Sequence, residues 1–107
     1  MYARRVSMAL KPDSRADLTN KLESQIIPVL RKQTGFKDLI TFISPDGEQA
    51  FGISLWDTRD NAEKYDRTAY ASVAKVLSTV VKDTPKVRAF EVTNSTFHHI
   101  ADKQKAA

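Results

Sequence analysis

The stretch LITFISPDGEQAFGISLW, residues 39–56, decides the fold of this chain. It contains two runs rich in β-branched and aromatic residues on either side of the turn Ser44-Pro45-Asp46-Gly47, which is the sequence signature of a β-hairpin. Proline sets the backbone angle at the second turn position, and glycine accepts the positive φ at which the chain re-enters a strand. A helical pattern and a further strand pattern lie on each side of this hairpin, so the sequence is nearly symmetric about it.

The N-terminal side of the hairpin predicts one strand and one helix. Residues 2–10 place small or apolar side chains on both faces, apart from Arg4 and Arg5, which indicates a strand covered on both sides. The following segment carries an apolar residue at every fourth position and predicts an amphipathic helix: Leu18, Leu22, Ile26 and Leu30. Pro28 removes one helical hydrogen bond, so we expect a bend rather than an end there, with Gly35 as the C-cap.

The C-terminal side repeats this order. Asp57 or Thr58 is expected to cap a second helical region, which should break near Arg67 and Thr68 into a short helix and a longer one. Residues 87–97 return to β character. The remaining residues, 101–107, are predicted to form a polar tail.

The predicted order is therefore β-α-β-β-α-β, an α+β ferredoxin-like fold with a four-stranded antiparallel sheet and both helical regions on one face. Residues 1–100 are predicted to form a single domain of this kind. Small or apolar residues occupy both faces of several strands, so the face without helices should also be covered. A second copy of the chain is the simplest cover, because homodimers are the commonest soluble assemblies.

Composition excludes several classes of function. The chain has no cysteine, which excludes disulfides and thiolate metal sites, and it has no apolar run near the roughly 18 residues that span a bilayer. No secretory signal pattern opens it, so a cytoplasmic protein without a membrane partner is expected. The net charge of +4 is spread along the chain rather than gathered in one segment, which argues against a nucleic-acid partner.

Three segments resemble the antibiotic-biosynthesis-monooxygenase-like group: SLWDT at 54–58, RDNA at 59–62 and the proline-led final strand at 85–92. The resemblance implies a dimeric α/β barrel, in which two sheets pack face to face and a pocket lies between each sheet and its helices. Members include cofactor-independent oxygenases, haem-degrading enzymes and proteins of unknown role. The resemblance thus implies a small-molecule-binding protein that oxidises an aromatic or polyketide-like substrate without a cofactor. A non-catalytic dimeric binding or interaction module remains the alternative.

Two related functions are disfavoured by missing residues. The haem-degrading members use an Asn in the first strand and a His in the second helix, and neither residue type occurs at residues 2–10 or 61–82, respectively. RNA-recognition domains share the same element order, and residues 49–56 echo their aromatic motif through Phe51, Gly52 and Trp56. However, the leading basic residue and the second stacking aromatic of that motif are absent. No haem or other cofactor and no nucleic acid are therefore expected.

No catalytic residue is identifiable, but seven side chains are candidates for the wall of a substrate pocket. Tryptophan and tyrosine provide flat apolar surfaces with a polar atom, strand hydroxyls and amides orient an acidic phenol or enol, and histidine suits proton transfer near neutrality. The candidates are Trp56, Tyr65, Tyr70, Ser7, Ser54, Asn94 and His99. No metal site is expected: His98 and His99 would point to opposite faces if the strand continued through them, and no carboxylate or third His lies at a metal-like spacing. For Trp56, Tyr65 and Tyr70 the sequence favours a role as core anchors over a role in binding.

The third strand leaves one question open. Its residues alternate between a small row, Ala50, Gly52 and Ser54, and a large row, Phe51, Ile53 and Leu55. If the small row faces the helices, side-chain volume is missing there and a ligand pocket is expected. If the large row faces them, the space is filled and the small residues lie on the other face.

Overall fold

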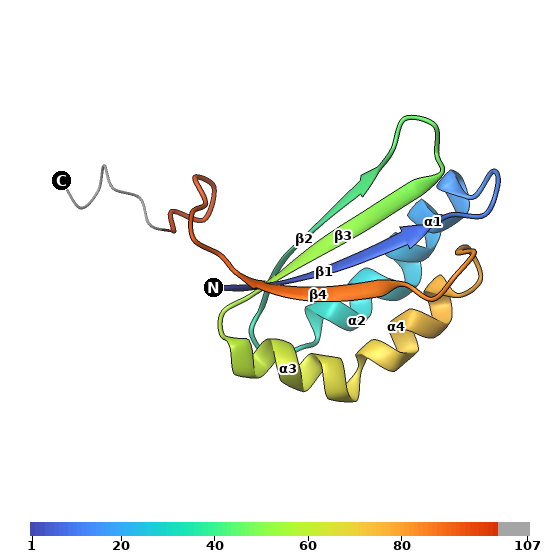
Figure 1. The fold of residues 1–107 in the computed structure, drawn as a ribbon. Helices are drawn as coiled ribbons and strands as arrows, with labels where there is room; N and C mark the ends of the chain where they lie inside the picture. Colours follow the sequence, from blue (N-terminus) through green and yellow to red (C-terminus); the bar gives the residue numbers. More distant parts are fainter. Residues whose placement is uncertain (101–107) are drawn as a thin grey trace.

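Four antiparallel strands form one sheet in the order β2-β3-β1-β4, in a computed structural model that describes residues 1–100. The central strand β1 (Tyr2–Ala9) pairs with β3 (Gln49–Trp56) on one side and with the edge strand β4 (Lys86–Glu91) on the other. The other edge strand, β2 (Phe36–Ile43), forms the predicted hairpin with β3. All helices cover the same face of the sheet (Figure 1). The predicted α+β ferredoxin-like fold is confirmed.

The first helical region passes through Pro28 without a break. α1 (Arg15–Lys21) leads into a π-helical turn, η1 (Leu22–Ile26), and then into α2 (Ile27–Arg31). In η1 the N–H of Ile27 bonds to the carbonyl of Leu22, five residues earlier, so the turn is wider than an α-helical turn just before the proline. The predicted continuation of the helix past Pro28 is confirmed. The predicted end at Gly35 is wrong, because the C-cap is Lys32, and Gly35 (φ 84°) lies in the connection to β2.

The second helical region is divided beside Thr68 as predicted, but its first helix is the longer of the two, not the shorter. α3 (Arg59–Thr68) and α4 (Tyr70–Leu77) are separated by Ala69, which has φ −114° and ψ −21°. Thr58 caps α3, since its hydroxyl oxygen accepts a hydrogen bond from the N–H of Asn61 at 3.2 Å. No helix in residues 1–100 is both long enough and apolar enough to span a membrane.

The final strand is shorter than the sequence predicts. β4 ends at Glu91, opposite Tyr2, where β1 begins, and one further backbone hydrogen bond, from the N–H of Val92 to the carbonyl oxygen of Met1 at 3.0 Å, closes the pairing. The chain then crosses to the opposite edge of the sheet, where Nε2 of His98 lies 3.3 Å from Oδ2 of Asp38 on β2. The predicted strand at residues 92–97 is therefore wrong. The predicted polar tail, residues 101–107, lies outside the described part of the chain.

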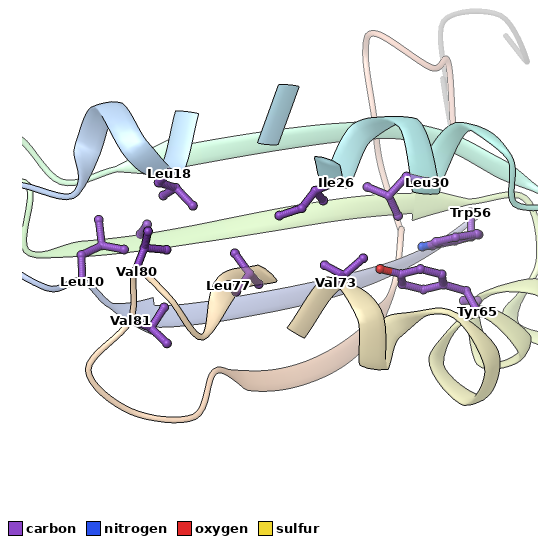
Figure 2. Close-up of a cluster of buried hydrophobic side chains, with 12 residues drawn as sticks. Leu10, Leu18, Ile26, Leu30, Trp56, Tyr65, Val73, Leu77, Val80 and Val81 are labelled. Carbon is purple, nitrogen blue, oxygen red and sulfur yellow. The ribbon is translucent and has the colours of Figure 1, made fainter. Parts of the chain in front are cut away.

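The hydrophobic core lies between the sheet and the helices (Figure 2). Trp56 and Tyr65 lie against each other at one end of this core, and Leu10 and Val80 lie at the other end. Trp56, Leu10 and Val80 are the largest side chains that are fully buried. The core fixes the orientation of β3, because Ala50 and Ser54 of the small row are buried beneath the helices and line the space there.

Candidate ligand site

A small apolar cavity of about 60 Å³ lies between the sheet and the helices. The small row of β3 forms part of its floor, and Gly52 leaves space there. A Cβ atom at Gly52 would meet only Thr41 Cγ2 at 3.6 Å and Leu39 Cδ1 at 3.7 Å, both ordinary van der Waals contacts. The helices supply an apolar wall, formed by Leu18, Leu22, Ile26, Leu30, Val73 and Leu77. The cavity therefore follows from the pairing of small strand residues with aliphatic helix residues.

The polar part of the cavity wall is built around Arg4, which lies on the helix side of β1. The Arg4 side chain is only 5% exposed, and its Nη2 donates a hydrogen bond of 2.6 Å to Oδ1 of Asp66 on α3. The Arg4 guanidinium carbon lies 4.6 Å from the centre of the Tyr70 ring and 5.0 Å from that of Tyr65. Two cation–π contacts and one ion pair thus hold a buried positive charge beside an apolar space.

Burial changes the acidity of both tyrosines. Desolvation raises the pKa of Tyr65 to about 12, although the nearby Arg4 charge opposes this shift. Desolvation also raises the pKa of Tyr70, again against the effect of Arg4. Both hydroxyls therefore stay protonated at neutral pH, where they can donate a hydrogen bond but cannot act as a base.

Three of the predicted pocket residues line the cavity together: Ser54, Tyr65 and Tyr70. Trp56 lies behind them and is fully buried. Its indole N–H donates a hydrogen bond of 2.9 Å to the Ser54 hydroxyl oxygen, and its ring stacks on Tyr65 with ring centres 4.9 Å apart. Figure 2 shows this stack at the end of the core. Trp56 supports two lining residues without lining the cavity itself.

The other three predicted residues lie away from this cavity. Ser7 has the opposite parity to Arg4 on β1, so it belongs to the face without helices, where its hydroxyl lies 3.5 Å from the Lys86 carbonyl oxygen. Asn94 is exposed in the segment that follows β4. His99 is exposed in a turn and has φ 57°. The shortened final strand explains the last two positions, since these residues leave the sheet before they can point into it.

Sequence reasoning missed Arg4 and Asp66. The available signal was a single charged residue on the row of β1 that otherwise holds Tyr2, Val6 and Met8. Its partner could not be found in this way, because Asp66 is 62 residues away in the sequence. Within residues 1–100, no group of three or more His, Asp or Glu side chains is arranged to hold a metal ion.

Comparison with known proteins shows similarity in structure only. No protein-family model matches this sequence, and no curated protein sequence matches it either. The monooxygenase from the gene ActVA-Orf6 of Streptomyces coelicolor, solved with nanaomycin D, superposes with a TM-score of 0.75 at 15% identity over 88% of each chain. The protein NE2512 of unknown function from Nitrosomonas europaea has a TM-score of 0.71 at 14% identity over 89% of this chain and 91% of its own.

A protein from Bordetella bronchiseptica that is assigned as an antibiotic biosynthesis monooxygenase has a TM-score of 0.70 at 16% identity over 85% of this chain and 95% of its own. These structures confirm the resemblance to the antibiotic-biosynthesis-monooxygenase-like group at the level of the fold.

Proposed function

We propose that this chain, which shares the fold of the antibiotic biosynthesis monooxygenases, binds a small apolar or aromatic molecule in the cavity between its sheet and helices. One observation carries the proposal: the small row of β3 faces the helices and leaves apolar space with a few polar groups at its wall. Small-molecule sites usually have this composition.

The ligand must enlarge the cavity in order to bind. Typical ligand pockets measure roughly 300–1,000 Å³, whereas this cavity measures about 60 Å³. Met8, Leu22 and Leu77 in its wall have flexible side chains whose rotamers can change. We therefore infer that binding requires repacking of the wall, which makes the affinity sensitive to the size of residues on the cavity floor.

We propose oxidation of an aromatic or polyketide-like substrate without a cofactor as the activity of this site. The Streptomyces coelicolor neighbour, a monooxygenase solved with nanaomycin D, supports this proposal. The ionisable groups at the cavity, Arg4, Tyr65 and Tyr70, include no base at neutral pH. The substrate must therefore be acidic enough to ionise by itself before dioxygen attacks it. The same observation favours the second candidate, a binding module without catalysis.

We further propose that the chain acts as a homodimer joined through the sheet face that carries no helices. Three large apolar residues of this face are strongly exposed: Ile40 by 44%, Phe42 by 43% and Phe90 by 39%. A second copy would remove this surface from water.

Fluorescence of Trp56 tests the binding proposal, because Trp56 is the only tryptophan and contacts two residues of the cavity wall. Titration with naphthoquinones and naphthols should give saturable quenching that is lost in Gly52→Val. Oxygen uptake in proportion to the consumption of an anthrone would identify an oxygenase. Ligand binding without oxygen uptake would identify a binding module. Absence of saturable binding up to millimolar ligand would refute both candidates.

A further inference from the structure

Arg4 has more hydrogen-bonding capacity than its protein partners use. A guanidinium has five N–H donors, and Arg4 donates one hydrogen bond to Oδ1 of Asp66, while a hydrogen bond to the Tyr65 side chain partly offsets the rise in the pKa of that tyrosine. Tyr65 and Tyr70 contact the guanidinium through their rings. Within residues 1–100, no fully buried side-chain nitrogen or oxygen lacks a partner. Each nitrogen of the Arg4 guanidinium therefore has a protein partner or is at least partly accessible, which leaves donors for a ligand.

That accessible space lies on two sides. Arg4 lines the apolar cavity, and it also lines a cleft of about 170 Å³ formed by β1, β4 and α3, in which Tyr2, Ala62, Asp66 and Ala89 take part. It is the only residue shared by the two linings in the described part of the chain. A ligand that enters from the cleft would thus meet the guanidinium before it reaches the apolar wall.

We propose that Arg4 is the anion-recognition residue of this site, and that it binds an ionised oxygen, either phenolate, enolate or carboxylate, on an otherwise flat and apolar ligand. The inference rests on the proposed binding function and adds the charge of the ligand to it. A charge-assisted hydrogen bond is stronger than a neutral one, and the low dielectric around a 5% exposed side chain strengthens it further.

Asp66 is suited to give way to such a ligand. Its side chain is 53% exposed, so water can stabilise the carboxylate when Arg4 turns to another anion. The Tyr65 and Tyr70 rings pack on the guanidinium and line the cavity, and their hydroxyls, which stay protonated at neutral pH, provide two further donors to the site. The site therefore combines a cation, two neutral donors and an apolar wall.

The test compares two ligands of nearly equal shape and different charge. 2-Hydroxy-1,4-naphthoquinone is ionised at neutral pH, and 2-methoxy-1,4-naphthoquinone is neutral. The wild-type protein should bind the hydroxy compound at least tenfold more tightly, a difference of about 1.4 kcal/mol. Binding should also lower the apparent pKa of the hydroxy compound, which its absorbance reports directly and without any mutation. 2-Naphthoate, compared with methyl 2-naphthoate, extends the same test to carboxylates.

Three variants locate the effect. Arg4→Gln should reduce the preference for the anionic ligand to less than threefold, whereas Asp66→Asn should increase it, because the competing carboxylate is removed. Arg5→Gln is the matched control, since the neighbouring Arg5 lies on the other face of the sheet, against Phe51, and its loss should leave the preference unchanged.

The outcomes separate this inference from the binding proposal. If both naphthoquinones bind equally well and the pKa of the hydroxy compound is unchanged on binding, the role of Arg4 is refuted while binding stands. If neither compound nor the naphthoate pair binds, the proposed function fails, and the inference fails with it. If Arg4→Gln does not fold, two measurements still test the role of Arg4. They are the pKa of the hydroxy compound bound to the wild type and the preference of Asp66→Asn for the anionic ligand.

Discussion

Gly52→Ala should make the protein more stable and its ligand site worse. Gly52 lies inside β3, where glycine costs roughly 0.5–1 kcal/mol relative to alanine. The added Cβ would lie 3.6 Å from Thr41 Cγ2 and 3.9 Å from the Ile40 carbonyl oxygen, so no neighbour has to move. We expect the free energy of unfolding to rise by about 1 kcal/mol, which corresponds to a melting temperature roughly 4–8 °C higher.

The same methyl group occupies part of the floor of a cavity of only about 60 Å³. The affinity for a naphthoquinone should therefore fall while stability rises. Opposite changes in stability and affinity are expected at a functional site that keeps a destabilising residue, because the residue that gives the highest stability is then not the one that gives the tightest binding.

The two remaining glycines provide matched controls. Gly47 has φ 76° and open space around it, so Gly47→Ala should lose roughly 1–2 kcal/mol of stability through backbone strain alone and leave binding unchanged. Gly35 has φ 84°, and a Cβ there would collide with the Asp57 carboxylate and with Asn61. Gly35→Ala should thus be the least stable of the three, by more than about 2 kcal/mol.

Thermal and urea denaturation give the order of stability, and fluorescence titration gives the affinities. The expected order is Gly52→Ala, wild type, Gly47→Ala and Gly35→Ala, from most to least stable. A less stable Gly52→Ala would mean that the helices pack against the strand more tightly than the structure indicates. A more stable Gly52→Ala with unchanged affinity would refute the location of the ligand.

Three further predictions concern the core, the acidity of the site and the assembly. Trp56→Ala should lower the free energy of unfolding by about 3–5 kcal/mol in urea denaturation, because the fully buried indole leaves a cavity; a loss below 1 kcal/mol would contradict its place in the core. Burial raises the pKa of Tyr65 from 10.0 to about 12, so its protonated hydroxyl contributes fully to stability below pH 10. Urea denaturation at each pH should show a loss of up to about 2–3 kcal/mol in the free energy of unfolding between pH 10 and 12. Tyr65→Phe should lack this loss. In sedimentation at micromolar concentration the wild type should have about twice the chain mass of 12.0 kDa, and Phe42→Asp on the exposed sheet face should have the mass of one chain; a monomeric wild type would refute the dimer.

The elements of this fold could be predicted because local interactions decide them. The hairpin at residues 39–56, a cap at Asp57 or Thr58 and the helix break beside Thr68 each depend on neighbours within a few residues; each is confirmed, with Thr58 as the cap. The helix through Pro28 also follows from its local apolar spacing. The π-helical turn before the proline was not predicted from this spacing.

The final strand shows where local patterns fail. Residues 92–97 have β character, but a strand exists only where another strand pairs with it, and the ladder between β1 and β4 stops at the pair Tyr2 and Glu91. The pairing partner is nearly 90 residues away along the chain, so no local pattern could reveal its end. Asn94 and His99 were placed near the pocket for this reason and lie elsewhere.

The sequence by itself determined the order of elements and the presence of a small and a large row on the third strand. Only the tertiary structure decided that the small row faces the helices, because either row can satisfy an alternating strand pattern until the helices are packed against one face. It also decided that Arg4 is buried with Asp66, Tyr65 and Tyr70. A charged residue in a strand looks exposed in sequence, and only the approach of α3 and α4 across the sheet supplies the partners that allow its burial.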